Sequence, residues 1–250
     1  MITIGRRVYG LGAILIGVTG LVLDNFAAMG LPGAAHLPGH QILAYACATL
    51  LVGAGAAINL PRTAAAAALV LAGYFAVWLV ALNLTHAAVQ PMVWVSWEDV
   101  AEKTAMVLGG LLAYALIPGV NAARAALIAR FAPRLFGVCA VVFGVSEFVY
   151  AKFTASLVPA WLPPSQLFWT YATGAAHVAA GLAIASGIKA RWAAVALTAM
   201  YLVFQLIVHL PRVIAGPAHA GAWSENGVNL LLCGAAWCLA DALSRPKAQA

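Results

Sequence analysis

Long apolar runs recur along the whole chain and constrain its fold more than any other feature. Each run has about 17 to 23 residues, and a helix of about 20 residues crosses a hydrocarbon core of roughly 30 Å. The runs are Val8–Met29, Ile42–Leu60, Ala64–Thr85, Val100–Ile117, Leu135–Ala151, Leu167–Ile188, Trp192–Leu210 and Val228–Leu243. The sequence therefore predicts an all-α integral membrane protein with about eight transmembrane helices.

The composition excludes most soluble classes of protein. Hydrophobic residues make up 64% of the chain and charged residues 8%, whereas soluble domains contain about 25% charged residues. Thirteen basic residues stand against seven acidic ones, but they are scattered between the apolar runs and form no basic patch of the kind that binds nucleic acid. We expect the lipid bilayer as the main partner and no nucleic acid.

The basic residues also predict how the chain sits in the membrane. With eight spans both ends share one side, and all Lys and Arg residues except Lys103, Lys152 and Arg212 fall on that side. By the positive-inside rule this side is cytoplasmic. We therefore expect a multi-pass protein of the cell (inner) membrane with both termini in the cytoplasm, and any chemical site is expected to open outward.

The two halves of the chain are similar at a displacement of about 126 residues. Leu37-Pro38 meets Leu162-Pro163, Trp97 meets Trp223, and His86 falls near His209 with a small gap. Each half has an even number of spans, which predicts two parallel four-helix repeats related by an axis along the membrane normal. The expected domains are a first repeat over residues 1–118, a cytoplasmic linker over 119–133 and a second repeat over 134–250.

Several runs of the second half resemble the DoxX-like family of small four-helix membrane proteins. They are Ser146-Glu147-Phe148-Val149-Tyr150, Leu157–Pro163, Tyr171–His177 and His209–Val213. The resemblance ends near Asn229, and the first half resembles the family only weakly. It implies a four-helix unit of a kind associated with quinone-linked oxidation of sulfur compounds or with oxidative-stress proteins.

Two ionisable residues of the second half depart from the pattern of that family. The family has a His in its first helix and a Glu in its second, whereas here Glu147 and His177 stand in the exchanged places. Such an exchange suits an acid and a base that contact each other across adjacent antiparallel helices. The first half has Gly20 and Leu50 at these places and lacks the pair.

Buried ionisable groups in a membrane are costly unless paired, so Glu147 and His177 are the first candidates for chemistry. A hydrogen-bonded pair of this kind can relay protons to a quinone or gate a transported cation. The structural alternative is an inter-helix bond worth about 0.5 to 2 kcal/mol.

A second polar face lies near the outer end of the seventh span. Gln205, His209 and Arg212 recur at spacings of four and three, so they share one side of a helix. With Glu225 and Asn229 they can line an outward cavity that receives a quinone-like or anionic head group. The alternative is interfacial anchoring of Arg212 and His209. The candidate catalytic residues are thus Glu147, His177 and His209, and the candidate binding residues are Tyr150, Gln205, Arg212, Glu225 and Asn229.

The sequence predicts neither a metal site nor a thiol redox site. His36 and His40 lie four residues apart, but no further ligands accompany them. The four cysteines stand in apolar segments without the Cys-x-x-Cys spacing.

Three functional classes remain. The first is a redox-linked subunit that binds a quinone or similar lipid-soluble molecule in the second repeat, beside a partner membrane or peripheral oxidoreductase. The second is a small-solute transporter or channel, against which stands the lack of broken helices at matching places of the two halves. The third is a scaffold for another membrane protein. The DoxX-like resemblance favours the redox-linked class.

Overall fold

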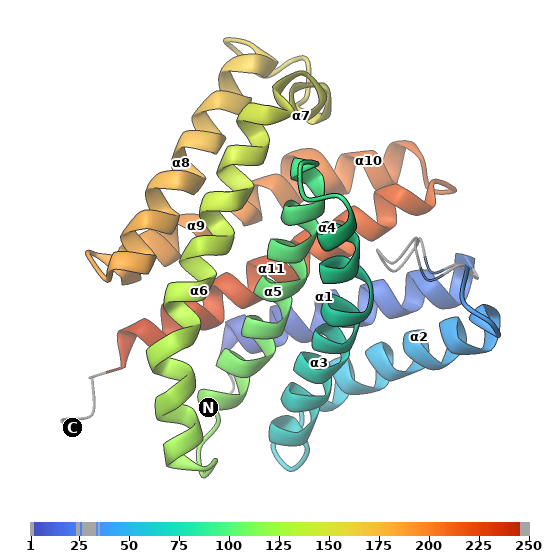
Figure 1. The fold of residues 1–250 in the computed structure, drawn as a ribbon, viewed down its shortest axis with the longest axis vertical. Coiled ribbons are helices and arrows are strands. Elements are labelled where there is room, and N and C mark those ends of the chain that lie inside the picture. Colours follow the sequence, from blue (N-terminus) through green and yellow to red (C-terminus); the bar gives the residue numbers. More distant parts are fainter. Residues whose placement is uncertain (1–2, 24–25, 27–33, 35, 246–250) are drawn as a thin grey trace.

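The structure is a computed structural model that describes residues 3–23, 26, 34 and 36–245. These residues form helices joined by short turns, with no strand among them. The long helices run alternately toward the upper right and the lower left of Figure 1, and both chain ends lie at the lower left. The predicted all-α fold is therefore confirmed. The end of the first expected span, at Met29, lies outside the described residues.

The helices follow one another with few interruptions. In chain order they are α1 (Ile4–Leu23), α2 (His40–Ala57), α3 (Ala64–Trp78), η3 (Leu79–Leu84), α4 (Thr85–Val89), α5 (Trp94–Ala115), α6 (Ala122–Val149), α7 (Ala151–Leu157), α8 (Gln166–Ser186), α9 (Ala190–Phe204), η4 (Gln205–His209), α10 (Leu210–Ala215) and α11 (Ala220–Ser244). The segments η3 and η4 are π-helical, and each joins two α-helices into one continuous rod.

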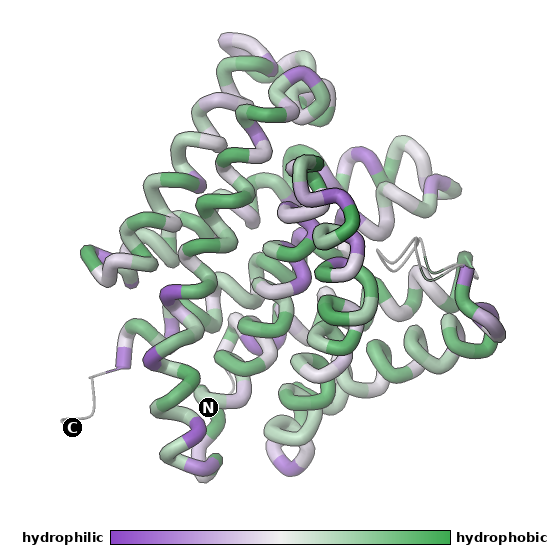
Figure 2. Tube along the Cα trace, in the orientation of Figure 1, coloured by the Kyte–Doolittle hydropathy of each residue, from purple (hydrophilic) through white to green (hydrophobic). Residues whose placement is uncertain are grey.

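Seven helices of the described chain are long and apolar enough to span a membrane. The seven include the continuous rods Ala64–Val89 and Ala190–Ala215. The helix α5, which contains most of the expected span Val100–Ile117, is not among them because Glu98, Asp99, Glu102 and Lys103 occupy its first turns. Figure 2 shows the helices as mainly hydrophobic, with hydrophilic residues gathered mostly toward their ends. By length and composition alone, seven helices thus qualify where the sequence predicts about eight.

The helix α6 begins earlier than the sequence predicts. It starts at Ala122, so most of the expected linker over residues 119–133 is helical. Asn121 caps the helix by accepting a hydrogen bond from the backbone N–H of Arg124 at 2.9 Å, and the alanine-rich sequence that follows has high helix propensity. Pro133 lies inside the helix. The proline was expected to end a linker, but α6 continues through it to Val149.

The centre of the fold is formed by α5 and α11. The helix α11 packs against α1, α5 and α9, and α5 packs against α3, α6 and α11. Close approach is possible because small residues stand at the crossings. A Cβ atom on Gly12 of α1, for example, would lie 2.6 Å from the backbone N of Leu231 in α11. The backbones of α1 and α11 therefore touch directly at this point.

This contact gives a first prediction. Replacing Gly12 by Ala should lower the free energy of unfolding by about 1 to 3 kcal/mol, because the added methyl group overlaps the α11 backbone. The matched control is Gly53→Ala in α2, where an added Cβ has nothing within 4 Å, so the higher helix propensity of alanine should leave stability unchanged or raised. Equilibrium unfolding in mixed detergent micelles measures both. Equal stability of the two variants would contradict the close crossing of α1 and α11.

Candidate functional site

The predicted acid and base lie in contact between α6 and α8. Glu147 Oε1 is 2.6 Å from His177 Nδ1, and both residues are almost fully buried. Because an ionised carboxylate can only accept, the imidazole Nδ1–H donates when Glu147 carries a charge. The two residues come from helices that run antiparallel and next to each other, as the sequence predicts.

A threonine holds the second oxygen of the carboxylate. The Thr173 hydroxyl contacts Glu147 Oε2 and lies 2.7 Å from the carbonyl oxygen of Trp169. Thr173 and His177 are four residues apart, so both face α6 from the same side of α8. Both oxygens of Glu147 are therefore hydrogen-bonded, which lowers the cost of keeping a carboxylate away from water.

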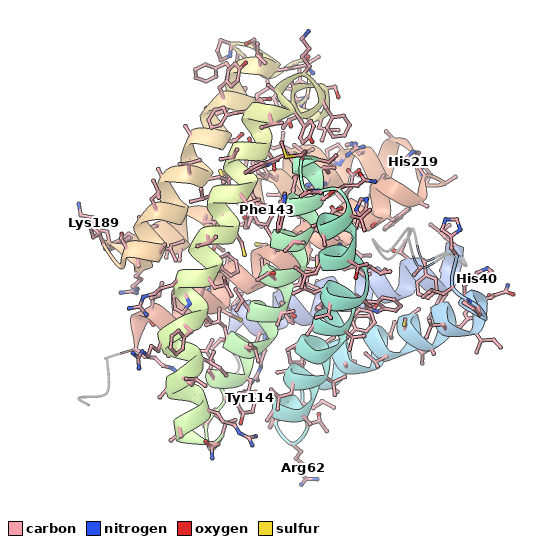
Figure 3. All side chains as sticks on the ribbon, viewed as in Figure 1. His40, Arg62, Tyr114, Phe143, Lys189 and His219 are labelled. Carbon is pink, nitrogen blue, oxygen red and sulfur yellow. The ribbon has the colours of Figure 1, made fainter. Side chains whose placement is uncertain are left out.

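Aromatic rings surround the other side of the imidazole. The ring centroid of His177 lies 6.1 Å from that of Phe143, 5.5 Å from that of Tyr201 and 6.2 Å from that of Phe204. Figure 3 labels Phe143 near the middle of the molecule, on α6. The imidazole is thus polar toward Glu147 and apolar elsewhere.

Two buried polar atoms of this site are left without a hydrogen bond. Neither His177 Nε2 nor the hydroxyl oxygen of Tyr201 has a partner within the part of the chain that the structure describes. Buried polar groups usually have a partner, and an unsatisfied one costs about 1 to 3 kcal/mol. Two such atoms on neighbouring rings are therefore a notable feature of the site.

The residues of the predicted polar face of the seventh span contact different partners. Gln205 and His209 lie in the π-helical segment η4, and Arg212 lies in α10. Gln205 bonds to Asn226 and Asn229 of α11, the latter at 2.8 Å. We call Gln205, Asn226 and Asn229 the amide cluster. Its members satisfy one another, so it joins η4 to α11.

The remaining predicted binding residues also have protein partners. Arg212 contacts the carboxylate of Glu225, and both side chains are partly exposed. The Tyr150 hydroxyl accepts a hydrogen bond from the backbone N–H of Val95 at 3.1 Å, which ties the end of α6 to the first turn of α5. His209 is different, because its Nδ1 is buried without a partner among the described residues. The structure does not bring His209 into contact with the Glu147–His177 pair.

Tyr201 connects the two groups of residues, and the sequence-based reasoning missed it. Its ring lies against His177, and its carbonyl oxygen accepts a hydrogen bond from Asn229 Nδ2 at 3.0 Å. An aromatic residue in an apolar helix carries no signal of its own in a membrane sequence. Only the crossing of α9 between α8 and α11 reveals its position.

The first half of the chain also contributes to the site, which the sequence did not predict. The Trp94 indole N–H donates to Ser146 Oγ at 2.8 Å, and Ser146 directly precedes Glu147. Glu98, one turn further along α5, interacts with the Ser146 hydroxyl and lies within electrostatic range of Glu147. In the sequence Glu98 lies just before the predicted span Val100–Ile117, and only this position distinguishes it from other charged residues.

Comparison with known proteins gives one match. The second half is similar to a family described as a domain of unknown function (DUF8561), whose sequence profile matches residues 136–237. The matched residues run from α6 into α11 and include Glu147, His177 and the amide cluster. No curated protein and no solved structure matches the chain. The DoxX-like resemblance therefore stays a prediction.

The contact between Glu147 and His177 gives a second prediction. Glu147→Ala and His177→Leu should each destabilise the protein by about 3 to 5 kcal/mol, because each leaves a buried group without its partner. The double variant should lose much less than the sum of the two. Unfolding in mixed micelles provides the four stabilities of this double-mutant cycle. Additive losses would contradict a direct interaction.

Proposed function

We propose that the chain is a multi-pass protein of the cell (inner) membrane whose eight long helical segments cross the bilayer with both termini in the cytoplasm. The seven apolar helices support this proposal. Figure 3 labels Arg62 and Lys189 at the lower and left margins of the molecule, and His40 and His219 at its right margin. The turns that carry Arg62 and Lys189 thus lie away from those that carry His40 and His219, and the positive-inside rule assigns the side with more Lys and Arg to the cytoplasm.

Equivalent contacts support the proposed pair of parallel four-helix repeats. A Cβ atom on Gly17 of α1 would meet the carbonyl oxygen of Ala48 and the side chain of Leu51 in α2. A Cβ atom on Gly144 of α6 would meet the carbonyl oxygen of Gly174 and the side chain of His177 in α8. By these contacts Leu51 occupies the place of His177 in the first half. The comparison of the two sequences placed the neighbouring Leu50 there.

The π-helical segments support the same correspondence. The segments η3 and η4 begin at Leu79 and Gln205, about 126 positions apart. Beyond them, Trp97 donates to the carbonyl oxygen of Pro91 and Trp223 to that of Pro217. This gapless displacement matches His86 with Arg212, and not with His209 as the gapped comparison of the sequences predicted.

For the second half we propose a redox-linked role, in which the Glu147–His177 pair exchanges protons with a bound quinone. The observation that carries this proposal is the pair of unpartnered atoms, His177 Nε2 and the Tyr201 hydroxyl, beside aromatic rings. An imidazole N–H and a phenol O–H are donors, and the oxygen atoms of a quinone are acceptors. Aromatic rings at stacking distance suit the flat ring of such a molecule.

The proposed chemistry uses both nitrogen atoms of His177. The conversion of a quinone to a quinol consumes two electrons and two protons, and a partner oxidoreductase supplies the electrons. As Nε2–H passes its proton to the quinone oxygen, Nδ1 takes a proton from Glu147. Glu147 is then left as a carboxylate, which Thr173 and Nδ1–H stabilise. The pair therefore alternates between two exchangeable protons and one, and it takes up a proton from water before it supplies the second proton of the quinol.

The neighbouring polar residues position this site. The amide cluster fixes the backbone of Tyr201 through Asn229, and the Arg212–Glu225 contact holds α10 on α11. Phe204 is only half-buried and packs against His177. In this proposal, rotation of its side chain admits a quinone ring from the lipid.

The matched π-helical segments also favour a second candidate function, a proton-coupled carrier of a small solute. Such segments are frequent at functional sites, and parallel repeats occur in transporters. The helices that contain η3 and η4 are continuous, so the lack of broken helices still stands against transport.

Quinone binding provides the test and a third prediction. The full chain in lipid nanodiscs should bind a short-chain quinone saturably, and His177→Leu and Tyr201→Phe should each weaken binding about tenfold, the equivalent of one hydrogen bond of about 1.4 kcal/mol. Tyr74→Phe removes the hydroxyl of a buried tyrosine in the first half and should leave the affinity unchanged. Equal affinities in all variants would overturn the assigned site. No saturable binding, together with solute-dependent proton movement in proteoliposomes, would favour the carrier.

A further inference from the structure

We infer that Glu98, a residue of the first half, is the group through which protons reach Glu147. This inference rests on the proposed proton exchange at Glu147 and His177. It also assigns a role to α5, whose charged first turns distinguish it from the seven apolar helices.

Two hydrogen bonds fix the start of α5 against the end of α6. Trp94 donates to Ser146 Oγ at 2.8 Å, and the backbone N–H of Val95 donates to the Tyr150 hydroxyl at 3.1 Å. Residues four apart lie on the same face of a helix, so Glu98 follows Trp94 on the side that faces α6. The Glu98 carboxyl is therefore beside Ser146 and in electrostatic range of Glu147, as its interactions show.

Burial increases along the proposed path. Glu98 is half-buried and lies in the second turn of its helix, whereas Glu147 is 9% exposed and His177 is 3% exposed. Glu98 is thus the most exposed member of this group. In the proposed membrane orientation the start of α5 faces the outer aqueous phase.

The charges around Glu98 suit a group that passes protons onward. Its titratable neighbours are carboxylates, namely Asp99 and Glu102 of α5 and Glu147 of α6. Among the described residues, the interactions of Glu98 include no cation, because Lys103 and His86 interact with Asp99 and Lys103 contacts Glu102 at 2.5 Å. A proton can move between Glu98 and Glu147 without separating an ion pair.

The transfer moves one proton from water through Glu98 to Glu147. Glu98 takes a proton from water and becomes neutral. It then gives this proton to the ionised Glu147, and Glu98 becomes the carboxylate. Ser146, held by Trp94, positions the Glu98 carboxyl for the transfer and does not change its own charge.

Infrared spectroscopy of the full chain in lipid nanodiscs tests this inference. The carboxyl absorption that disappears in Glu147→Gln reports the protonation of Glu147, and its rise after a rapid drop in pH gives the rate of proton uptake. We expect Glu98→Gln to slow this rate about a hundredfold, the low end of the range for a lost proton-transfer group. Glu98→Asp, which keeps a carboxyl group, should restore most of the rate, and Ser146→Ala should slow it less than Glu98→Gln does.

The matched control is Asp99→Asn, which removes the adjacent carboxylate of α5 that faces His86 and Lys103. Its rate should equal that of the natural protein. A normal rate in Glu98→Gln and Ser146→Ala would overturn the role of Glu98 while leaving the proton exchange of Glu147 intact. If no carboxyl absorption of Glu147 changes with pH in the natural protein, both the inference and the proposed function are wrong.

Discussion

The close crossing of α6 and α8 is the contact on which the candidate site depends. A Cβ atom on Gly144 would lie 2.6 Å from the carbonyl oxygen of Gly174 and 2.9 Å from the Cβ atom of His177. Only a glycine fits at that point, and the helix backbones meet there. Glu147 follows Gly144 by one turn and His177 follows Gly174 by one turn, so the crossing brings their side chains to 2.6 Å. Without the glycines the acid and the base would be separated, and each would be buried without its partner.

The same crossing exists in the first half without its chemistry. Gly17 and Ala48 take the places of Gly144 and Gly174, and Leu51 contacts Gly17 as His177 contacts Gly144. The packing therefore needs only small residues at the crossing, and the ionisable pair is an addition to it. The amide cluster also belongs to the second half. What the first half provides is α5, which supports α6 from the other side through Trp94.

Much of the fold can be predicted from the sequence, because apolar runs and glycines leave a direct pattern. The long helices and the pairing of Glu147 with His177 follow from run length and from the order of antiparallel helices. The start of α6 at Ala122 was missed because a proline and three arginines looked like a linker, although alanine propensity and the Asn121 cap favour a helix. The segment η4 was missed because Gln205, His209 and Arg212 also fit ordinary α-helical spacing.

The rest of the site depends on how helices rotate and cross, which one sequence does not reveal. Tyr201 resembles any other aromatic residue of an apolar helix until its ring is found against His177. Glu98 resembles a helix-end charge until α5 is found to lie against α6. The sequence predicts Arg212 and Glu225 as binding residues but does not predict that they contact each other. In each case the position of the residue in the site depends on a partner from another helix.

The central claim is that Glu147 and His177 share exchangeable protons inside the helix bundle. Nitrogen-15 NMR of histidine-labelled protein in lipid nanodiscs tests it most directly, with the signals of His177 assigned by their loss in His177→Gln. The account predicts that the His177 nitrogen signals shift in Glu147→Gln, because the carboxyl group bonded to Nδ1 is replaced by an amide. Signals that stay the same in Glu147→Gln would contradict it, because His177 would then be a packing residue that exchanges no proton with Glu147.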